Sequence, residues 1–224
     1  MIITIDGPAA SGKSTISRMT AENLTFYYLN TGLLYRAVTY LLMHQYDYTK
    51  QTLTSVQNDD LVACTDATRF FYLYSSSNGP SIVYDNKDIT DFLKDPVIDQ
   101  YVSLISPQAS VREALSNLQR AIAHTHDVVV EGRDVGSVVF PDADYKFYLT
   151  ASLKVRAIRW QAYQEKKGNT YSLEQSMDRV EQRDLQDKNR AHSPLVVPDK
   201  AITIDNSNLT LKESVQAILK HIKN

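Results

Sequence analysis

The chain has 224 residues, of which 43% are hydrophobic and 22% charged, with a formal net charge of −2. This size and composition predict one globular domain, residues 1–224, with a substantial core, and they exclude an intrinsically disordered chain. The balanced charge predicts no nucleic-acid partner, and the absence of a long apolar run predicts no membrane association.

The first residues suggest where the protein works. The chain enters an apolar stretch directly, so we expect no signal peptide and a cytoplasmic protein. The only cysteine, Cys64, lies in the apolar run 61–64 and cannot form an internal disulfide. We expect it to be a core thiol in a reducing compartment.

The strongest signal lies in the first 24 residues. The apolar run 2–5 predicts a buried strand, and the apolar spacing of 15–24 predicts a helix. Between them, residues 7–14 match G-x-x-x-x-G-K-[ST], the phosphate-binding loop. We expect Lys13 to reach the β- and γ-phosphates of a nucleotide and the Ser14 hydroxyl to bind Mg²⁺. The alternative, a Gly-rich turn that only caps a helix, is disfavoured by the strand and helix on either side.

The next elements indicate the fold class. Residues 26–29 predict a second strand, and the apolar stripe through 33–45 predicts a second helix. Alternating strands and helices with short connections predict an α/β fold, in which a central parallel sheet is flanked by helices. A polar stretch then ends in a predicted short helix over 56–68.

An antiparallel patch interrupts this pattern. Residues 69–74 and 81–84 predict two strands around a Ser/Asn/Gly/Pro turn at 75–80, and 85–88 predict a second turn. A hairpin inside a parallel α/β chain indicates an insertion. Two further helices are predicted to follow, over 96–105 and 111–125.

The parallel pattern returns at 126–130, a predicted buried strand followed by the polar turn 131–136. Two more strands are predicted over 145–149 and 201–205, with a closing helix over 209–222. In open α/β sheets, ligands bind beyond the carboxyl ends of the strands. The phosphate-binding loop and the 131–136 turn are therefore expected at the same edge of the sheet.

Arginines are concentrated late in the chain, where five of the eleven lie between positions 156 and 190. Acidic residues are interleaved with them, so a solvated helical face is one interpretation. Phosphoryl transfer favours another, because arginine side chains can follow negative charge from donor to acceptor. Arg183, Asp187 and Arg190 have the spacing i, i+4, i+7 and would share one face of a helix. Gly168 and Asn169 could form the tip of a mobile lid.

A regulatory GTPase is the alternative from another class. It would carry D-x-x-G, but none of the seven glycines follows an aspartate at that spacing. It would also carry N-K-x-D, whereas the segment 86–89 has Ile89 in place of the aspartate. A motor or nucleic-acid ATPase would need a longer, more basic chain. The histidines show no metal-ligand or triad spacing, so a small-molecule kinase remains.

Three segments make the kinase hypothesis more specific. Residues 30–36, 128–143 and 183–195 resemble the bacterial cytidylate kinase family, and the likeness runs nearly end to end. It implies a P-loop kinase fold, with a nucleoside-monophosphate-binding region at 31–125, an insertion at about 66–106 and a lid at 156–172. It also implies Mg²⁺-dependent transfer of the ATP γ-phosphoryl group to CMP or dCMP by a monomer.

The resemblance assigns roles to individual residues. The ATP phosphates would be bound by Gly7, Pro8, Ala9, Ala10, Ser11, Gly12, Lys13, Ser14 and Thr15, with Arg156 and Arg159 in the lid region over ATP. The acceptor phosphate would be held by Arg36, Arg133 and Arg190, with Arg183 near the sugar and the transferring group. Cytosine and ribose would be recognised by Ser103, Arg112 and Asp187, and Thr31 and Tyr35 would line the acceptor pocket. Asp134 would orient Arg133 or a magnesium-bound water.

Three positions depart from the family pattern. Asn30 and Glu131 each stand where aspartate is more common, and Trp160 stands where another arginine is common. We expect Asn30 to remove a negative charge near the phosphates and Trp160 to loosen lid contacts. Glu131 keeps the charge and adds one methylene group.

Overall fold

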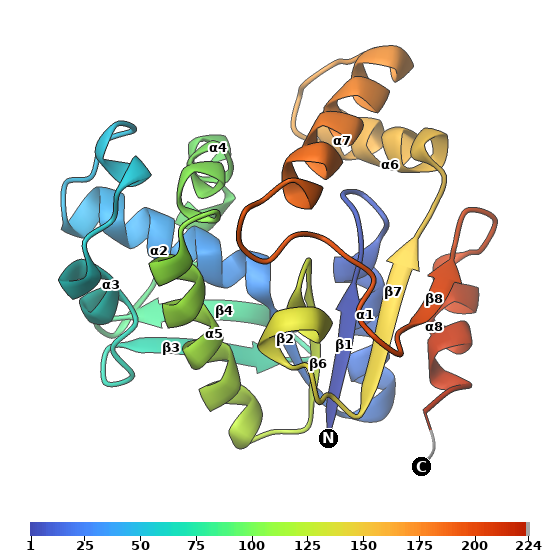
Figure 1. The fold of residues 1–224 in the computed structure, drawn as a ribbon, viewed down its shortest axis with the longest axis horizontal. Helices are drawn as coiled ribbons and strands as arrows, with labels where there is room; N and C mark the ends of the chain where they lie inside the picture. The colour runs from blue at the N-terminus through green and yellow to red at the C-terminus, as the bar shows by residue number, and fades with distance from the viewer. Residues whose placement is uncertain (223–224) are drawn as a thin grey trace. The chain divides into compact units, whose positions relative to one another are not determined.

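The computed structural model describes residues 1–222; the last two residues of the predicted domain, 223 and 224, lie outside the described residues. Its largest sheet has five strands in the order β2-β6-β1-β7-β8, drawn in Figure 1. The pairs β1–β6, β1–β7 and β7–β8 are all parallel. These strands are β1 (Ile2–Asp6), β2 (Tyr27–Asn30), β6 (Val128–Gly132), β7 (Tyr145–Thr150) and β8 (Ile202–Asp205). The predicted α/β fold with a central parallel sheet is confirmed.

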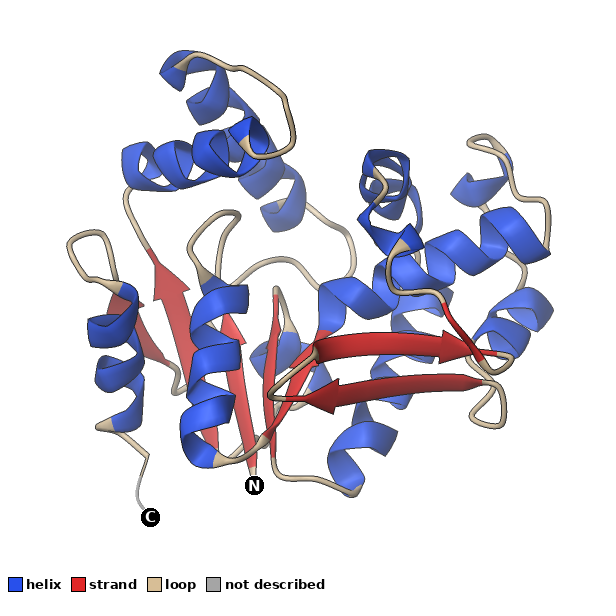
Figure 2. Ribbon diagram, turned by 180° about the vertical axis from the view of Figure 1, so that it is seen from behind, coloured by secondary structure: helices blue, strands red, loops and turns tan. Residues whose placement is uncertain are grey.

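The chain divides into two compact units, of which the first comprises residues 1–26 and the chain from Asp127 onward. In this first unit, helices α1 (Lys13–Leu24) and α8 (Leu211–Leu219) cover one face of the sheet, as Figure 2 shows. Helices α6 (Leu153–Glu165) and α7 (Leu173–Lys188) pack against each other beyond the carboxyl end of β7 (Figure 1).

Burial explains why β1 and β6 lie inside the sheet. Ile3, Ile5 and residues 128–130 have no exposed surface. Parallel strands covered on both faces typically form such continuous apolar runs. Asp6, the last residue of β1, is a fully buried exception. A buried carboxylate needs hydrogen-bond partners, so this position points to the functional edge of the sheet.

The second unit comprises residues 27–126. Its antiparallel sheet has the order β3-β4-β5, with β3 (Phe70–Ser75), β4 (Gly79–Tyr84) and β5 (Lys87–Asp88). Its helices are α2 (Thr31–Gln45), α3 (Asn58–Cys64), α4 (Pro96–Ile105) and α5 (Ala109–His124), with short 3-10 turns at Thr52–Thr54 and Phe92–Lys94. Cys64 is fully buried, as expected of a core thiol.

Several element boundaries differ from the predictions for local reasons. Helix α2 begins at Thr31 because the Asn30 side chain caps it, accepting a hydrogen bond from the Leu33 N–H at 3.0 Å. Asparagine and aspartate serve about equally as N-caps, so the Asn30 departure preserves this structural role. The closing helix starts at Leu211 because Thr210 and Glu213 form a capping box.

Other boundaries are set by tertiary packing. Gly79 and Pro80 belong to β4 instead of the predicted turn, and α3 covers only part of 56–68. Strand β6 starts two residues later than predicted and takes in Glu131 and Gly132. Pairing with Ile5 and Asp6 of β1 extends the strand through these polar positions.

Candidate active site

The phosphate-binding loop connects β1 to α1. Gly7 must be glycine, because a Cβ there would lie 2.0 Å from the backbone oxygen of Leu149. Gly12 has a φ of +92°, a conformation that favours glycine, and caps α1. The first N–H groups of a helix have no partner within it and attract anions. The loop therefore has the backbone geometry of a phosphate site.

Lys13 is folded onto this loop. Its Nζ donates to the Pro8 carbonyl at 2.6 Å and to the Ser11 hydroxyl at 3.3 Å, and the residue is 5% exposed. Burial, together with the Arg133 charge, lowers the pKa of Lys13 to about 7, although Glu131 and Asp187 act to raise it. A bound anion near Nζ would favour the charged lysine.

Ser14 has a carboxylate partner. Its hydroxyl donates to Oε1 of Glu131 at 2.8 Å, and Glu131 is buried on β6 opposite Ile5. Mg²⁺ prefers oxygen ligands and binds nucleotide sites through one or two protein groups plus phosphates. Ser14 and Glu131 fit that donor set. Among residues 1–222 there is no cluster of three or more His, Cys, Asp or Glu side chains that could hold a metal without substrate.

Asp6 is a site residue that the sequence analysis missed. Its carboxylate accepts hydrogen bonds from the backbone N–H groups of Val135 (2.8 Å) and Gly136 (2.7 Å). Burial raises the pKa of Asp6 to about 7, although these two N–H groups act to lower it. The bonds join the end of β1 to the π-helical turn Val135–Val139, directly after Arg133 and Asp134. An aspartate closing an apolar strand was the available signal.

A buried carboxylate joins two of the predicted arginines. Nε of Arg133 donates to Asp187 at 2.7 Å, and Nη2 of Arg190 donates to the other oxygen of Asp187, which is only 2% exposed. Burial alone would raise the pKa of Asp187, but Arg133 and Arg190, with a further contribution from Arg183, lower it. Burial alone would lower the pKa of the Arg133 guanidinium, but the Asp187 carboxylate raises it. We call Arg133, Asp187 and Arg190 the arginine cluster.

One geometric expectation for this region was wrong. Helix α7 ends at Lys188, so Arg190 follows the helix and does not share a helical face with Arg183 and Asp187. Arg183 lies on the exposed side of α7. Asp187 still recruits Arg190 from the loop, because their ion pair does not need a continuing helix.

Arg159 stabilises the phosphate-binding loop by binding the backbone of Ser11. It donates to the Ser11 carbonyl at 3.1 Å and to Oδ1 of Asn206 at 2.9 Å. Asn206 is buried and also donates to the Ser11 carbonyl, at 2.9 Å. No motif singled out Asn206, which follows β8 and reaches the loop only through the tertiary fold. Arg156 contacts the same loop at the Ala9 carbonyl.

That Trp160 loosens lid contacts relative to an arginine stays a prediction, but Trp160 makes packing contacts of its own. The Trp160 ring packs on Tyr171 with centroids 4.9 Å apart, and neighbouring Gln161 donates to the Tyr171 carbonyl at 2.6 Å. These contacts tie α6 to the segment that precedes α7.

The remaining predicted residues belong to the second unit. The Arg112 guanidinium lies over the Tyr35 ring, 5.8 Å from its centroid, and donates to the Ser106 carbonyl at 3.0 Å. Arg36 on α2 pairs with Asp99 on α4, Nε to Oδ1, at 2.6 Å. Thr31 is the buried first residue of α2. Ser103 is exposed on α4 and donates to the Gln100 carbonyl at 2.6 Å.

Taken with the fold, the first unit defines the class of protein. A G-x-x-x-x-G-K-S loop joins β1 to α1 at the carboxyl edge of a parallel sheet, and a lysine and arginines gather there. This is a P-loop protein of the kinase class. No helix in the described part of the chain has the length and apolarity to cross a bilayer.

Comparison with known proteins identifies the family. The model of the family described as cytidylate kinase matches residues 3–224. The chain is 37% identical over 221 residues to a cytidylate kinase of Caldanaerobacter subterraneus subsp. tengcongensis, covering 99% of this chain and 94% of that protein. It is 38% identical over 221 residues to a cytidylate kinase of Clostridium botulinum strain Langeland, covering 99% and 97%. This chain belongs to the cytidylate kinase family, which confirms the resemblance found in its sequence.

A solved structure supports the fold alone. An uncharacterized protein from Eubacterium ventriosum aligns over 99% of this chain and 98% of its own, with a TM-score of 0.51 and 12% sequence identity.

Proposed function

We propose that this chain transfers the γ-phosphoryl group of ATP to CMP or dCMP, giving ADP and CDP or dCDP. Membership of the cytidylate kinase family supports the type of reaction. The observation that carries the proposal is the contact between the donor loop and the segment that carries Arg133. The Ser14 hydroxyl donates to Glu131 at 2.8 Å, two residues before Arg133, so donor and acceptor phosphate groups would be bound next to each other.

The donor half consists of residues 7–15. Backbone N–H groups at the start of α1 would bind the ATP phosphates, and Lys13 would exchange its contacts with Pro8 and Ser11 for the β- and γ-phosphates. Ser14 and Glu131 would hold Mg²⁺. When bound, Mg²⁺ would neutralise charge on the β- and γ-phosphate oxygens.

The acceptor half uses the arginine cluster. Asp187 fixes Arg133 and Arg190, whose remaining N–H groups would bind the phosphate of CMP. Arg183 would supply further positive charge near the sugar and the transferring group.

Recognition of the base is assigned to the second unit. Arg36 would contact the acceptor phosphate, and Tyr35 and Thr31 would line the pocket. Arg112 would donate to the carbonyl side of cytosine, and Ser103 can donate or accept. That residues 27–126 form a compact unit supports a nucleoside-monophosphate-binding region at 31–125 with an insertion at about 66–106.

The reaction needs little proton chemistry. An oxygen of the acceptor phosphate attacks the γ-phosphorus, a new P–O bond forms, and the bond to the β,γ-bridging oxygen breaks as ADP leaves. The attacking oxygen is already ionised, so no strong general base is required, and positioning and charge neutralisation account for catalysis. Asp134 would orient Arg133. Residues 156–172 would act as a lid that excludes water.

A coupled assay of ADP release tests the proposal directly. CMP and dCMP should be turned over best in a series that also contains UMP, AMP, GMP, shikimate and gluconate. Preference for shikimate or gluconate would reject the cytidylate assignment while retaining a kinase. Activity that is unchanged after complete removal of divalent cations would reject the magnesium site.

The protein is further proposed to act as a monomer in the cytoplasm. Its single cysteine is buried, which suits a reducing compartment. Light scattering at assay concentration should give a mass near 25.4 kDa, and a dimer mass would reject the monomer.

A further inference from the structure

A buried ion pair lies against the phosphate-binding loop on the side of the lid helices. Asp184 comes from α7 and Arg156 from α6, and the two are 5% and 8% exposed. Nη1 of Arg156 donates to Oδ2 of Asp184. Neither the motifs nor the family comparison assigned a role to Asp184.

Both members of this pair bind the same loop residue. The backbone N–H of Ala9 donates to Oδ1 of Asp184 at 2.9 Å, and the Ala9 carbonyl accepts from Nη1 of Arg156 at 3.1 Å. Nε of Arg156 also donates to the Ala151 carbonyl at 2.9 Å, at the end of β7. The two backbone groups of Ala9 are thus held by side chains from two helices.

The hydrogen bonds with Asp184 and Arg156 fix the orientation of the backbone groups of Ala9. The Ala9 N–H is bonded to Asp184 and is therefore not available to a phosphate. The next residue, Ala10, has a φ of +56°, a left-handed conformation that alanine adopts only when its surroundings impose it. Holding Ala9 on both sides fixes the backbone immediately before this turn.

We propose that Asp184 and Arg156 are positioning residues that hold the phosphate-binding loop in its binding conformation and couple it to α6 and α7. The inference rests on the proposed function for its substrate, ATP, and assigns Arg156 a role through the loop. Movement of α6 or α7 is transmitted to Ala9 through this pair, and a bound triphosphate in turn stabilises the two helices.

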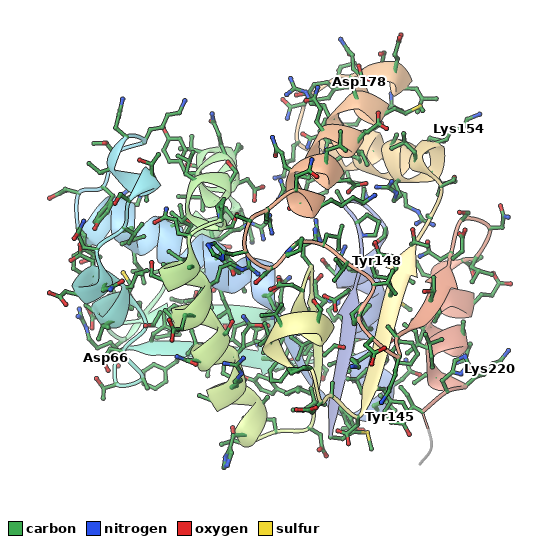
Figure 3. All side chains as sticks on the ribbon, in the orientation of Figure 1. Asp66, Tyr145, Tyr148, Lys154, Asp178 and Lys220 are labelled. Atoms are coloured by element: carbon green, nitrogen blue, oxygen red, sulfur yellow. The ribbon has the colours of Figure 1, made fainter. Side chains whose placement is uncertain are left out.

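The test separates loop positioning from simple fold stability. Replacing both charges with apolar groups, Asp184→Leu with Arg156→Met, leaves no uncompensated charge, and such replacements often keep or raise stability. Asp184→Asn is a milder variant that retains an oxygen for the Ala9 N–H and removes the charge that holds Arg156. Asp178→Asn on α7 and Lys154→Met on α6 are controls, since both residues lie on exposed turns of these helices (Figure 3).

Calorimetry with Mg²⁺ and a non-hydrolysable ATP analogue measures the donor site without an acceptor. We expect the double variant to remain folded and to bind the analogue at least about tenfold more weakly than the parent protein, as for the loss of hydrogen bonds to charged groups. Asp184→Asn should raise the dissociation constant in the same direction, and the two controls should stay within about twofold of the parent.

Two results would overturn the inference. One is a folded double variant that binds the analogue like the parent. The other is an Asp184→Asn protein indistinguishable from Asp178→Asn. Failure of the parent to phosphorylate CMP would reject the proposed function and leave this comparison intact, because binding of the analogue needs no acceptor.

Discussion

The donor loop and the acceptor residues are built in opposite ways. The donor loop is one stretch of nine residues, and most of its contacts to a phosphate would come from backbone groups. The proposed acceptor residues are side chains scattered from Thr31 to Arg190, and carboxylates hold several of them: Asp99 binds Arg36, and Asp187 binds Arg133 and Arg190. A local motif can therefore specify phosphate binding, whereas selection of the acceptor depends on distant pairings.

The largest expected effect is on the donor side of this comparison. Lys13→Ala removes the side chain that would follow the transferring phosphoryl group, and we expect kcat to fall by about 10³-fold or more, as for other key electrostatic groups. The ADP-release assay with CMP measures it. Lys154 is an exposed lysine on α6, so Lys154→Ala is the control and should leave kcat nearly unchanged. Full activity of Lys13→Ala would refute the assigned donor site.

Asp187→Asn probes the acceptor side. It weakens the carboxylate that holds Arg133 and Arg190, so the KM for CMP should rise by about 10²-fold, since small misplacements of positioning groups have effects of this size. Unfolding stability should fall by about 3 kcal/mol, because the two arginines lose a buried partner.

The Asp187→Asn protein should still bind ATP almost as the parent protein does. The dissociation constant for ATP should change by less than about threefold. Asp178 is an exposed aspartate on α7, and Asp178→Asn should change neither the KM for CMP nor the dissociation constant for ATP. Equal weakening of both substrates would show that the donor and acceptor halves are not separable.

Arg112→Ala tests base selection in the second unit. Losing a donor to cytosine should lower kcat/KM for CMP by about 10- to 100-fold while acceptor-free ATP hydrolysis stays unchanged. The assay measures kcat/KM for CMP, UMP and AMP, and the preference for CMP over the other two should become smaller. Arg120→Ala, exposed two turns further along α5, is the control. Equal losses with every acceptor would mean that Arg112 has a structural role.

Proton uptake gives a subtler distinction between the halves. The pKa of buried Lys13 is lowered to about 7, and nearby phosphates would raise it, so above pH 7 ATP binding should convert neutral lysine to its charged form. At pH 8.5, where Asp6 is ionised in both states, calorimetry in two buffers of different ionisation enthalpy should show net uptake approaching one proton. Lys13→Arg should abolish the uptake because arginine is charged throughout. CMP binding alone should show far less.

The smallest expected effect concerns a departure from the family pattern. Asn30→Ala removes the cap of α2 and should lower unfolding stability by about 1 kcal/mol, whereas Asn30→Asp should change it by less than about 0.5 kcal/mol. Thermal denaturation measures both. A large change in kcat for Asn30→Asp would show that charge at this position matters to catalysis more than capping.

Particular residues show which features of the structure could be predicted from the sequence and which could not. The order of the main strands and most helices could be predicted from apolar periodicity, and the hairpin from its Ser/Asn/Gly/Pro turn. The boundaries at Gly79 and at Glu131 could not, because partner strands determine where pairing stops. In the first unit, Asp187 was expected to recognise cytosine and ribose, but its simultaneous pairing with Arg133 and Arg190 became visible only in the fold.

The sequence by itself determined the phosphate-binding loop, the parallel α/β class and the family. These depend on local backbone geometry, periodic burial and contiguous motifs, all of which are recorded over short distances along the chain. Only the tertiary structure decided that Glu131 faces Ser14, that Asp6 holds the turn after Asp134, and that Asp184 and Arg156 hold Ala9. Those pairings join residues more than 100 positions apart, and burial makes each of them necessary, because a charged or polar group removed from water must find its partner wherever the fold places one.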